Sequence, residues 1–218
     1  MGKEHTAAEG RQAIIILPGI MGSEIFAKDD ITVKDAHFSA GERLWAPEAK
    51  DGFHIDEKIL ALAMTAEGEP VYPTYAAPPM GKPDGAGHFG TGDAYRSLYH
   101  GLSRRFRTPG CDVVLYTYDW RFSLFDTAKT LDDFIREHRY QDIVFIAHSM
   151  GGLISSAYLA MGEAQRTNTR LHISLGTPYL GAEKMVSVYG SGKILDGSFF
   201  AELANLIIDP PIRAFSFQ

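Results

Sequence analysis

The chain has 218 residues, 45% of them hydrophobic and 22% charged, and a formal net charge of -6. This composition is typical of a globular domain with a sizeable core. It argues against nucleic acid as the main partner, because phosphate recognition needs clustered Lys and Arg and the chain has no dense basic run. The single cysteine, Cys111, has no second thiol with which to form an internal disulfide. Together with the lack of a secretory signal in residues 1–12 and of a long apolar run, this favours a cytoplasmic location.

Four short apolar runs are predicted to be buried β-strands. They are residues 12–17 (QAIIIL), 111–116 (CDVVLY), 142–147 (DIVFIA) and, less cleanly, 171–175 (LHISL). Segments of helical period separate them: Ala94, Leu98, Leu102 and Phe106 share one face, Phe125, Leu131, Phe134 and Ile135 share another, and a third helix follows Ser149. Near-continuous apolar strands that alternate with helices predict an α/β fold, a mainly parallel sheet with helices on both faces.

Two segments interrupt this alternation of strands and helices. Residues 24–92, approximately, are mixed in character and rich in Gly and Pro, and we predict an insertion with small elements of its own after the first core strand. Residues 178–218 contain an apolar stretch followed by two prolines, and we predict that they begin a cap or lid. The predicted core is then residues 12–177.

The stretch AHSMGG, residues 147–152, lies between a predicted buried strand and a predicted helix. This is the context of a nucleophile elbow, a turn so tight that Ser149 adopts strained backbone angles and projects its hydroxyl above the sheet. Small residues two before and two after the serine, Ala147 and Gly151, let strand and helix approach closely. The usual first glycine is alanine here, which still meets the size requirement. The alternative is an ordinary strand-to-helix turn in which Ser149 caps the helix.

Two main-chain amides are candidates to bind an oxyanion at this serine. The helix after Ser149 directs its free N–H groups and positive dipole end toward the site, so the N–H of Met150 is one candidate. The second is expected from the loop after the first strand, residues 18–23 (PGIMGS), where glycines let the backbone bend toward a substrate. We assign the N–H of Ile20, with Met21 as the fallback. A plain glycine-rich turn is the alternative interpretation of this loop.

Four stretches occur in a characteristic order: LPGIMGS at 17–23, YDWR at 118–121, AHSMGG at 147–152 and LGTPYLGA at 175–182. Together they resemble the lecithin:cholesterol acyltransferase family, which includes lysosomal phospholipase, from about residue 12 to residue 185. The resemblance implies an α/β-hydrolase fold, a serine acyl-enzyme and a lipid ester as acyl donor. In such relatives the residue after Pro-Gly donates to the oxyanion, which supports Ile20.

The rest of a catalytic triad is expected in the chain order Ser, then Asp or Glu, then His. After Ser149 the one histidine is His172, which falls in the next predicted strand, too early for the general base. The late aspartates Asp196 and Asp209 fall in the predicted cap. We therefore expect the fold to be incomplete at its C-terminus and the isolated chain to be nearly inactive. A natural pseudoenzyme, or a partner chain that completes the site, is the alternative.

Three further residues have both a functional and a structural interpretation. Asp119 and Arg121 could be catalytic, but the triad acid of this fold follows the nucleophile, so we favour a buried ion pair. In the relatives, the inserted region carries a subdomain that contacts membranes. We therefore assign Trp45, with Met21, to substrate binding, and the alternative is that Trp45 only packs the insertion.

The sequence thus predicts serine-dependent acyl transfer or hydrolysis on lipid esters, with an acyl-enzyme at Ser149 and oxyanion donors at Ile20 and Met150. The expected partners are a lipid or ester substrate and a peripheral membrane surface. No cofactor is expected, and the histidines show no metal-ligand spacing. The alternatives are a carboxylesterase for small soluble esters and a non-catalytic binding protein with the same fold. The acyl donor, the acyl acceptor and the oligomeric state stay open.

Overall fold

The computed structural model describes residues 10–45, 54–77 and 92–181. Of the predicted cap, only residues 178–181 belong to this set, and Asp196 and Asp209 lie outside the described residues. Among the helices described, none is long and apolar enough to cross a lipid bilayer.

The centre of the fold is a four-stranded sheet in which every neighbouring pair of strands is parallel. Its spatial order is β7-β1-β8-β9. The strands are β1 (Arg11–Leu17), β7 (Cys111–Leu115), β8 (Tyr140–His148) and β9 (Thr169–Leu175). All four predicted strands are therefore present, and the parallel α/β sheet is confirmed. The prediction that all four are buried is wrong for β9, where Leu171, Ile173 and Leu175 are exposed.

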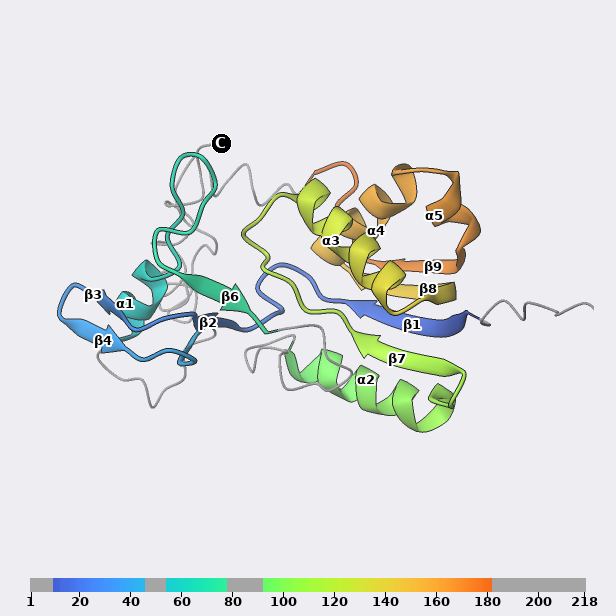
Figure 1. Ribbon diagram of the computed structural model, residues 1–218, viewed down its shortest axis with the longest axis horizontal. Coiled ribbons are helices and arrows are strands. Elements are labelled where there is room, and N and C mark those ends of the chain that lie inside the picture. The colour runs from blue at the N-terminus through green and yellow to red at the C-terminus, as the bar shows by residue number, and fades with distance from the viewer. Residues whose placement is uncertain (1–9, 46–53, 78–91, 182–218) are drawn as a thin grey trace, which may run out of the picture.

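Helices cover both faces of this sheet. Alternate residues of β1 point to opposite faces, and each set packs against different helices. Ile14 and Ile16 pack with α2 (Gly92–Phe106) in one buried cluster. Ile15 and Leu17 belong to a larger cluster that includes side chains of α3 (Leu124–Glu137) and α4 (Met150–Ala160). Figure 1 shows α2 on one side of the strands, with α3 and α4 on the other. Burial on both faces explains why β1 is an almost unbroken apolar run.

The predicted face of α2 was correct for Leu98 and Leu102, which pack against the sheet, and wrong for Ala94 and Phe106. Tyr95 and Tyr99 are buried, whereas Ala94 is exposed and 43% of Phe106 is accessible. The physical reason is that a tyrosine can bury its ring while its hydroxyl reaches a polar partner. A short helix, α5 (Glu163–Thr167), was not predicted, because five residues are too few to show a helical period.

The described part of the predicted insertion, residues 24–45 and 54–77, forms small elements of its own, and we keep the name insertion for these residues. Three strands make an antiparallel sheet in the order β5-β2-β6, namely β2 (Ile25–Ala27), β5 (Arg43–Trp45) and β6 (Thr74–Ala76). A hairpin of β3 (Ile31–Val33) and β4 (Ala36–Phe38) and the helix α1 (Ile55–Leu60) complete it. In Figure 1 these elements lie together beyond the carboxyl ends of the central strands. The insertion therefore borders the sheet edge at which α/β proteins bind ligands.

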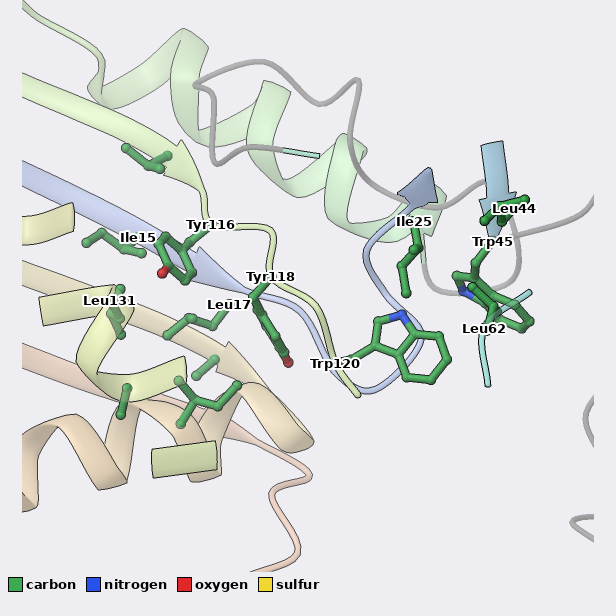
Figure 2. Close-up of a cluster of buried hydrophobic side chains, with 14 of the residues drawn as sticks. Ile15, Leu17, Ile25, Leu44, Trp45, Leu62, Tyr116, Tyr118, Trp120 and Leu131 are labelled. Carbon is green, nitrogen blue, oxygen red and sulfur yellow. The ribbon is translucent and has the colours of Figure 1, made fainter. Parts of the chain in front are cut away.

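Aromatic side chains join the insertion to the central sheet. Figure 2 shows one buried cluster that extends from Leu131 in the core, through Tyr118 and Trp120, to Trp45 in the insertion. The rings of Trp45 and Trp120 meet edge to face, with centroids 5.6 Å apart. The two parts of the chain consequently share a continuous apolar core.

Candidate active site

Ser149 occupies a strained turn between β8 and α4. Its φ angle is 51°, a left-handed value that is costly for a residue with a side chain. Two backbone hydrogen bonds fix the turn: the Ser149 N–H donates to the Leu175 carbonyl at 2.9 Å, and the Gly152 N–H donates to the Ser149 carbonyl at 3.0 Å. The Ser149 side chain makes no capping hydrogen bond to α4. The capping alternative is therefore not supported, and the half-buried hydroxyl is left available for chemistry.

Two glycines let the first turn of α4 fit between neighbouring segments. A Cβ atom added to Gly151 would lie 2.5 Å from the Leu17 carbonyl oxygen and 2.6 Å from that of Pro18. A Cβ atom at Gly152 would overlap the side chain of Thr177. The close approach expected at Gly151 is thus made to the end of β1 rather than to β8, and the constraint at Gly152 was not foreseen. The contact at Gly151 holds the turn at Ser149 against the end of β1 and the loop that follows it, and the contact at Gly152 holds the turn against Thr177 after β9.

The loop after β1 touches the serine directly. A Cβ atom at Gly19 would lie 3.0 Å from the Ser149 Cβ and 3.0 Å from Nδ1 of His148. The loop turns back on itself, because the Gly22 N–H donates to the Gly19 carbonyl at 3.0 Å and Met21 has a φ of 62°. Main-chain amides of residues 19–22 are therefore close to the hydroxyl-bearing turn.

Aromatic side chains hold the carbonyl groups of this loop from outside. The Tyr118 hydroxyl donates to the Pro18 carbonyl at 2.6 Å, and the Trp45 indole donates to the Met21 carbonyl at 2.9 Å. In a planar trans peptide, the N–H of the next residue points the opposite way from the carbonyl. Each of these bonds therefore fixes the direction of an amide as well as a carbonyl.

The amides that remain without a partner are those predicted to bind the oxyanion. Within the loop, the N–H of Gly19 donates to Tyr95 and the N–H of Gly22 donates to Gly19. Among the residues that the structure describes, the amides of Ile20, Met21 and Met150 have no acceptor. Met150 begins α4, where the first N–H groups have no partner within the helix.

Trp45 packs the interior instead of facing solvent. Only 4% of its surface is accessible, and its indole N–H is bound to the Met21 carbonyl. This burial favours the packing alternative over direct contact of Trp45 with a membrane or a substrate. Its influence on the site passes through the loop carbonyl that it holds.

Asp119 and Arg121 form a buried ion pair. Arg121 donates from Nε to Oδ1 of Asp119 at 2.9 Å and from Nη2 to Oδ2 at 2.6 Å. It also donates to the Leu62 carbonyl and the Thr74 hydroxyl of the insertion, at 3.0 and 2.6 Å. The pair therefore ties the loop after β7 to the insertion, which supports the structural interpretation over a catalytic one.

Replacing Arg121 with Met should destabilise the protein by about 3–5 kcal/mol, because it removes the guanidinium that neutralises the buried Asp119 carboxylate and keeps only the main-chain N–H of residue 121 of that pair's hydrogen bonds. Urea denaturation would measure this loss. The matched control is Lys129→Met, which removes an ion pair with Asp126 whose two side chains are each 66% exposed. We expect no measurable change in the control. Equal stability of the two variants would contradict the structural role of Arg121.

His172 lies against the middle of α4, away from Ser149. Its Nε2 is 2.8 Å from Oγ of Ser155, and its ring lies nearly perpendicular to that of Phe145. Burial lowers the pKa of His172 below its usual value of 6.5. These contacts agree with the expectation that His172 is not the general base.

The lowered pKa of His172 makes stability depend on pH. The unfolded chain binds a proton near pH 6.5, whereas the folded chain resists it. The contribution of His172 is thus complete above pH 6.5 and is lost as the pH falls through the lower, folded pKa. Melting curves should show a smaller drop between pH 7.5 and 5.5 in His172→Gln than in the wild type. Parallel pH profiles of the two proteins would refute this.

An apolar cavity of about 200 Å³ lies beside the site on the α2 side of the sheet. Its lining is Ile16, Leu17, Ala94, Tyr95, Leu98, Ile146, His148 and Leu175. Tyr95 and His148 carry the polar groups in this lining, and the Tyr95 hydroxyl lies 2.6 Å from Nδ1 of His148. Neither residue was predicted to be a site residue from the sequence, because they are 53 residues apart in the chain and come into contact only in the folded structure. In the described ranges, no three His, Cys, Asp or Glu side chains are placed to hold a metal ion.

A parallel α/β sheet with a strained serine at the carboxyl end of a central strand is the architecture of the α/β-hydrolase class. The family model for lecithin:cholesterol acyltransferase matches residues 97–209, just over half of the chain. The protein therefore belongs to the lecithin:cholesterol acyltransferase family. This membership indicates acyltransferase or phospholipase-type activity on lipids. No curated protein matches the chain.

Proposed function

We propose that the protein transfers acyl groups from lipid esters through an acyl-enzyme on Ser149. The observation that carries this proposal is the strained turn at Ser149. The Ser149 hydroxyl makes no capping hydrogen bond to α4, and the loop after β1 contacts the turn. The strain is costly and does not serve to cap α4, which favours a role in presenting the hydroxyl.

In the proposed reaction, Oγ of Ser149 attacks the ester carbonyl carbon and loses its proton to a general base. The carbonyl oxygen becomes an oxyanion, which accepts hydrogen bonds from the N–H groups of Ile20 and Met150. Collapse of this intermediate breaks the ester bond, and the alcohol portion leaves with a proton. Water or an acceptor hydroxyl then attacks the acyl-enzyme and frees Ser149. In this fold the base is a histidine that follows the serine in the chain; His172, bound to Ser155, is not suited to that role.

A lipid donor is favoured over a small soluble ester by the family to which the chain belongs. Met21 is half-buried in the loop after β1, residues 18–23, which we call the oxyanion loop. It is the side chain that we assign to contact the acyl group. A carboxylesterase would use the same serine and the same amides, so the substrate has to be tested directly. A binding protein would retain the turn but release no product.

The experiment compares two acyl donors with the complete protein. One is phosphatidylcholine in vesicles with a labelled acyl chain, and the other is a soluble butyrate ester. We expect faster turnover of the vesicle lipid, and acid-quenched samples should carry the acyl group on the peptide that contains Ser149. Rapid hydrolysis of the butyrate with intact vesicles would indicate a carboxylesterase. Vesicle binding without acyl release would indicate a binding protein.

A further inference from the structure

We propose that Tyr95 and His148 are positioning residues that fix the loop after β1 and thereby determine which of its amides faces the substrate. The inference rests on the proposed function, since it assigns to these two residues the alignment of the Ile20 oxyanion donor. Neither residue needs to touch the substrate in order to act in this way.

Tyr95 contacts both ends of the turn that carries Ile20. Its hydroxyl oxygen accepts the Gly19 N–H at 2.9 Å, and a Cβ atom at Gly22 would lie 2.9 Å from the Tyr95 ring. The side chain comes from α2 and is buried, so its position is set by the packing of a fifteen-residue helix on the sheet. The turn is therefore held by a rigid element rather than by its own short-range contacts.

The peptide between Pro18 and Gly19 is clamped from two sides. Tyr118 binds its carbonyl at 2.6 Å, while Tyr95 binds its N–H at 2.9 Å. Rotation of this peptide would break both bonds. The next peptide is fixed as well, because the Gly19 carbonyl accepts the Gly22 N–H. The N–H of Ile20 belongs to that peptide and must point away from Gly22.

His148 completes the arrangement by binding the Tyr95 hydroxyl. The 2.6 Å separation between the Tyr95 hydroxyl and Nδ1 of His148 is that of a short hydrogen bond. With the Gly19 N–H donated to the phenol oxygen, we assign the phenol proton to Nδ1 and the imidazole proton to Nε2. His148 immediately precedes Ser149, so the chain of bonds connects the oxyanion loop to the serine turn. Tyr95 and His148 both line the apolar cavity beside the site.

The test compares Tyr95→Phe with Tyr99→Phe, its matched control. Tyr99 lies one turn further along α2, is also buried and belongs to the same cluster, so its variant removes one hydroxyl without touching the loop. Loss of a whole oxyanion donor lowers kcat by roughly 10²–10³-fold, so a misaligned one should cost about tenfold or more. We expect this loss in kcat for Tyr95→Phe, with KM within about twofold of the wild type. Tyr99→Phe should keep the wild-type kcat.

Two further readouts separate positioning from a merely structural role. A trifluoromethyl ketone forms a tetrahedral adduct with an oxyanion, so its inhibition constant should rise in Tyr95→Phe in proportion to the fall in kcat. His148→Asn, which keeps an acceptor near the Nδ1 position, should retain more activity than His148→Leu. Rates are normalised to the folded fraction, which is measured by circular dichroism.

The inference is overturned if Tyr95→Phe keeps kcat within twofold of Tyr99→Phe, or if the inhibition constant does not change. It is also overturned if His148→Asn and His148→Leu are equally impaired. Failure of the proposed function would look different, because Ser149→Ala would then retain the activity of the wild type. If Ser149→Ala is inactive and Tyr95→Phe is fully active, only the positioning role is wrong.

Discussion

Replacing Ser149 with Ala should lower acyl transfer by at least about 10⁴-fold. Removal of a serine nucleophile leaves only binding and oxyanion stabilisation, and comparable serine hydrolases lose roughly 10⁶-fold in kcat. The fold should be retained, because the Ser149 side chain makes no capping bond and its backbone bonds to Leu175 and Gly152 do not involve the hydroxyl. The measurement is the initial rate of acyl release from labelled vesicles, together with a thermal melt.

The control is Ser123→Ala. Ser123 stands at the start of α3 as Ser149 does at the start of α4, and its side chain likewise makes no capping hydrogen bond. It lies outside the turn against which the oxyanion loop packs, so its variant should keep full activity. More than a tenth of the wild-type rate in Ser149→Ala would contradict the proposed acyl-enzyme.

Replacing Gly151 with Ala should damage both stability and activity. The new methyl group would lie 2.5 and 2.6 Å from two carbonyl oxygens, those of Leu17 and Pro18, and these are backbone atoms that cannot turn aside. The end of β1 and the first turn of α4 must therefore separate. Overpacking of this kind costs about 1–3 kcal/mol. A shift of about 1 Å in the oxyanion loop should lower kcat/KM by roughly 10²-fold.

Gly101→Ala is the matched control for this substitution. Gly101 is exposed in α2, and apart from its chain neighbours and the backbone of its own helix no heavy atom of the described residues lies within 4 Å of the position its Cβ would occupy. Alanine is favoured over glycine in a helix by about 1 kcal/mol, so this variant should be more stable and fully active. Denaturation curves and kcat/KM would be measured for both variants. Gly151→Ala with the stability and activity of Gly101→Ala would show that the close approach does not matter.

Much of the central fold could be predicted from the sequence, because buried parallel strands leave a strong local signal. The apolar runs that became β1, β7 and β8 were correctly placed, with ends that differ by no more than two residues. The strands of the insertion have only three residues each, which is too short for a periodic pattern. The face of α2 was only partly predicted, because a tyrosine such as Tyr95 does not add to an apolar pattern although its ring can be buried.

The parts of the candidate site that give a local sequence signal could be predicted, and those that depend on contacts between distant residues could not. The strained turn at Ser149 could be expected because its sequence signal lies within residues 147–152, although the contacts that fix it also involve Leu17, Leu175 and Thr177. The clamps on the oxyanion loop could not, because Trp45, Tyr95 and Tyr118 reach it from 24, 76 and 100 residues away. The assignment of Trp45 to substrate binding missed its structural role, because the hydrogen bond from its indole to the Met21 carbonyl forms only when the chain folds.

In the proposed mechanism, Ser149 presents its hydroxyl beside two main-chain amides. The most direct measurement is a crystal structure of the complete protein after reaction with a fluorophosphonate. We predict phosphorus bonded to Oγ of Ser149, with the phosphoryl oxygen about 2.7–3.1 Å from the N–H nitrogens of Ile20 and Met150. Phosphorus on another residue, or a phosphoryl oxygen turned away from both amides, would contradict the proposed mechanism.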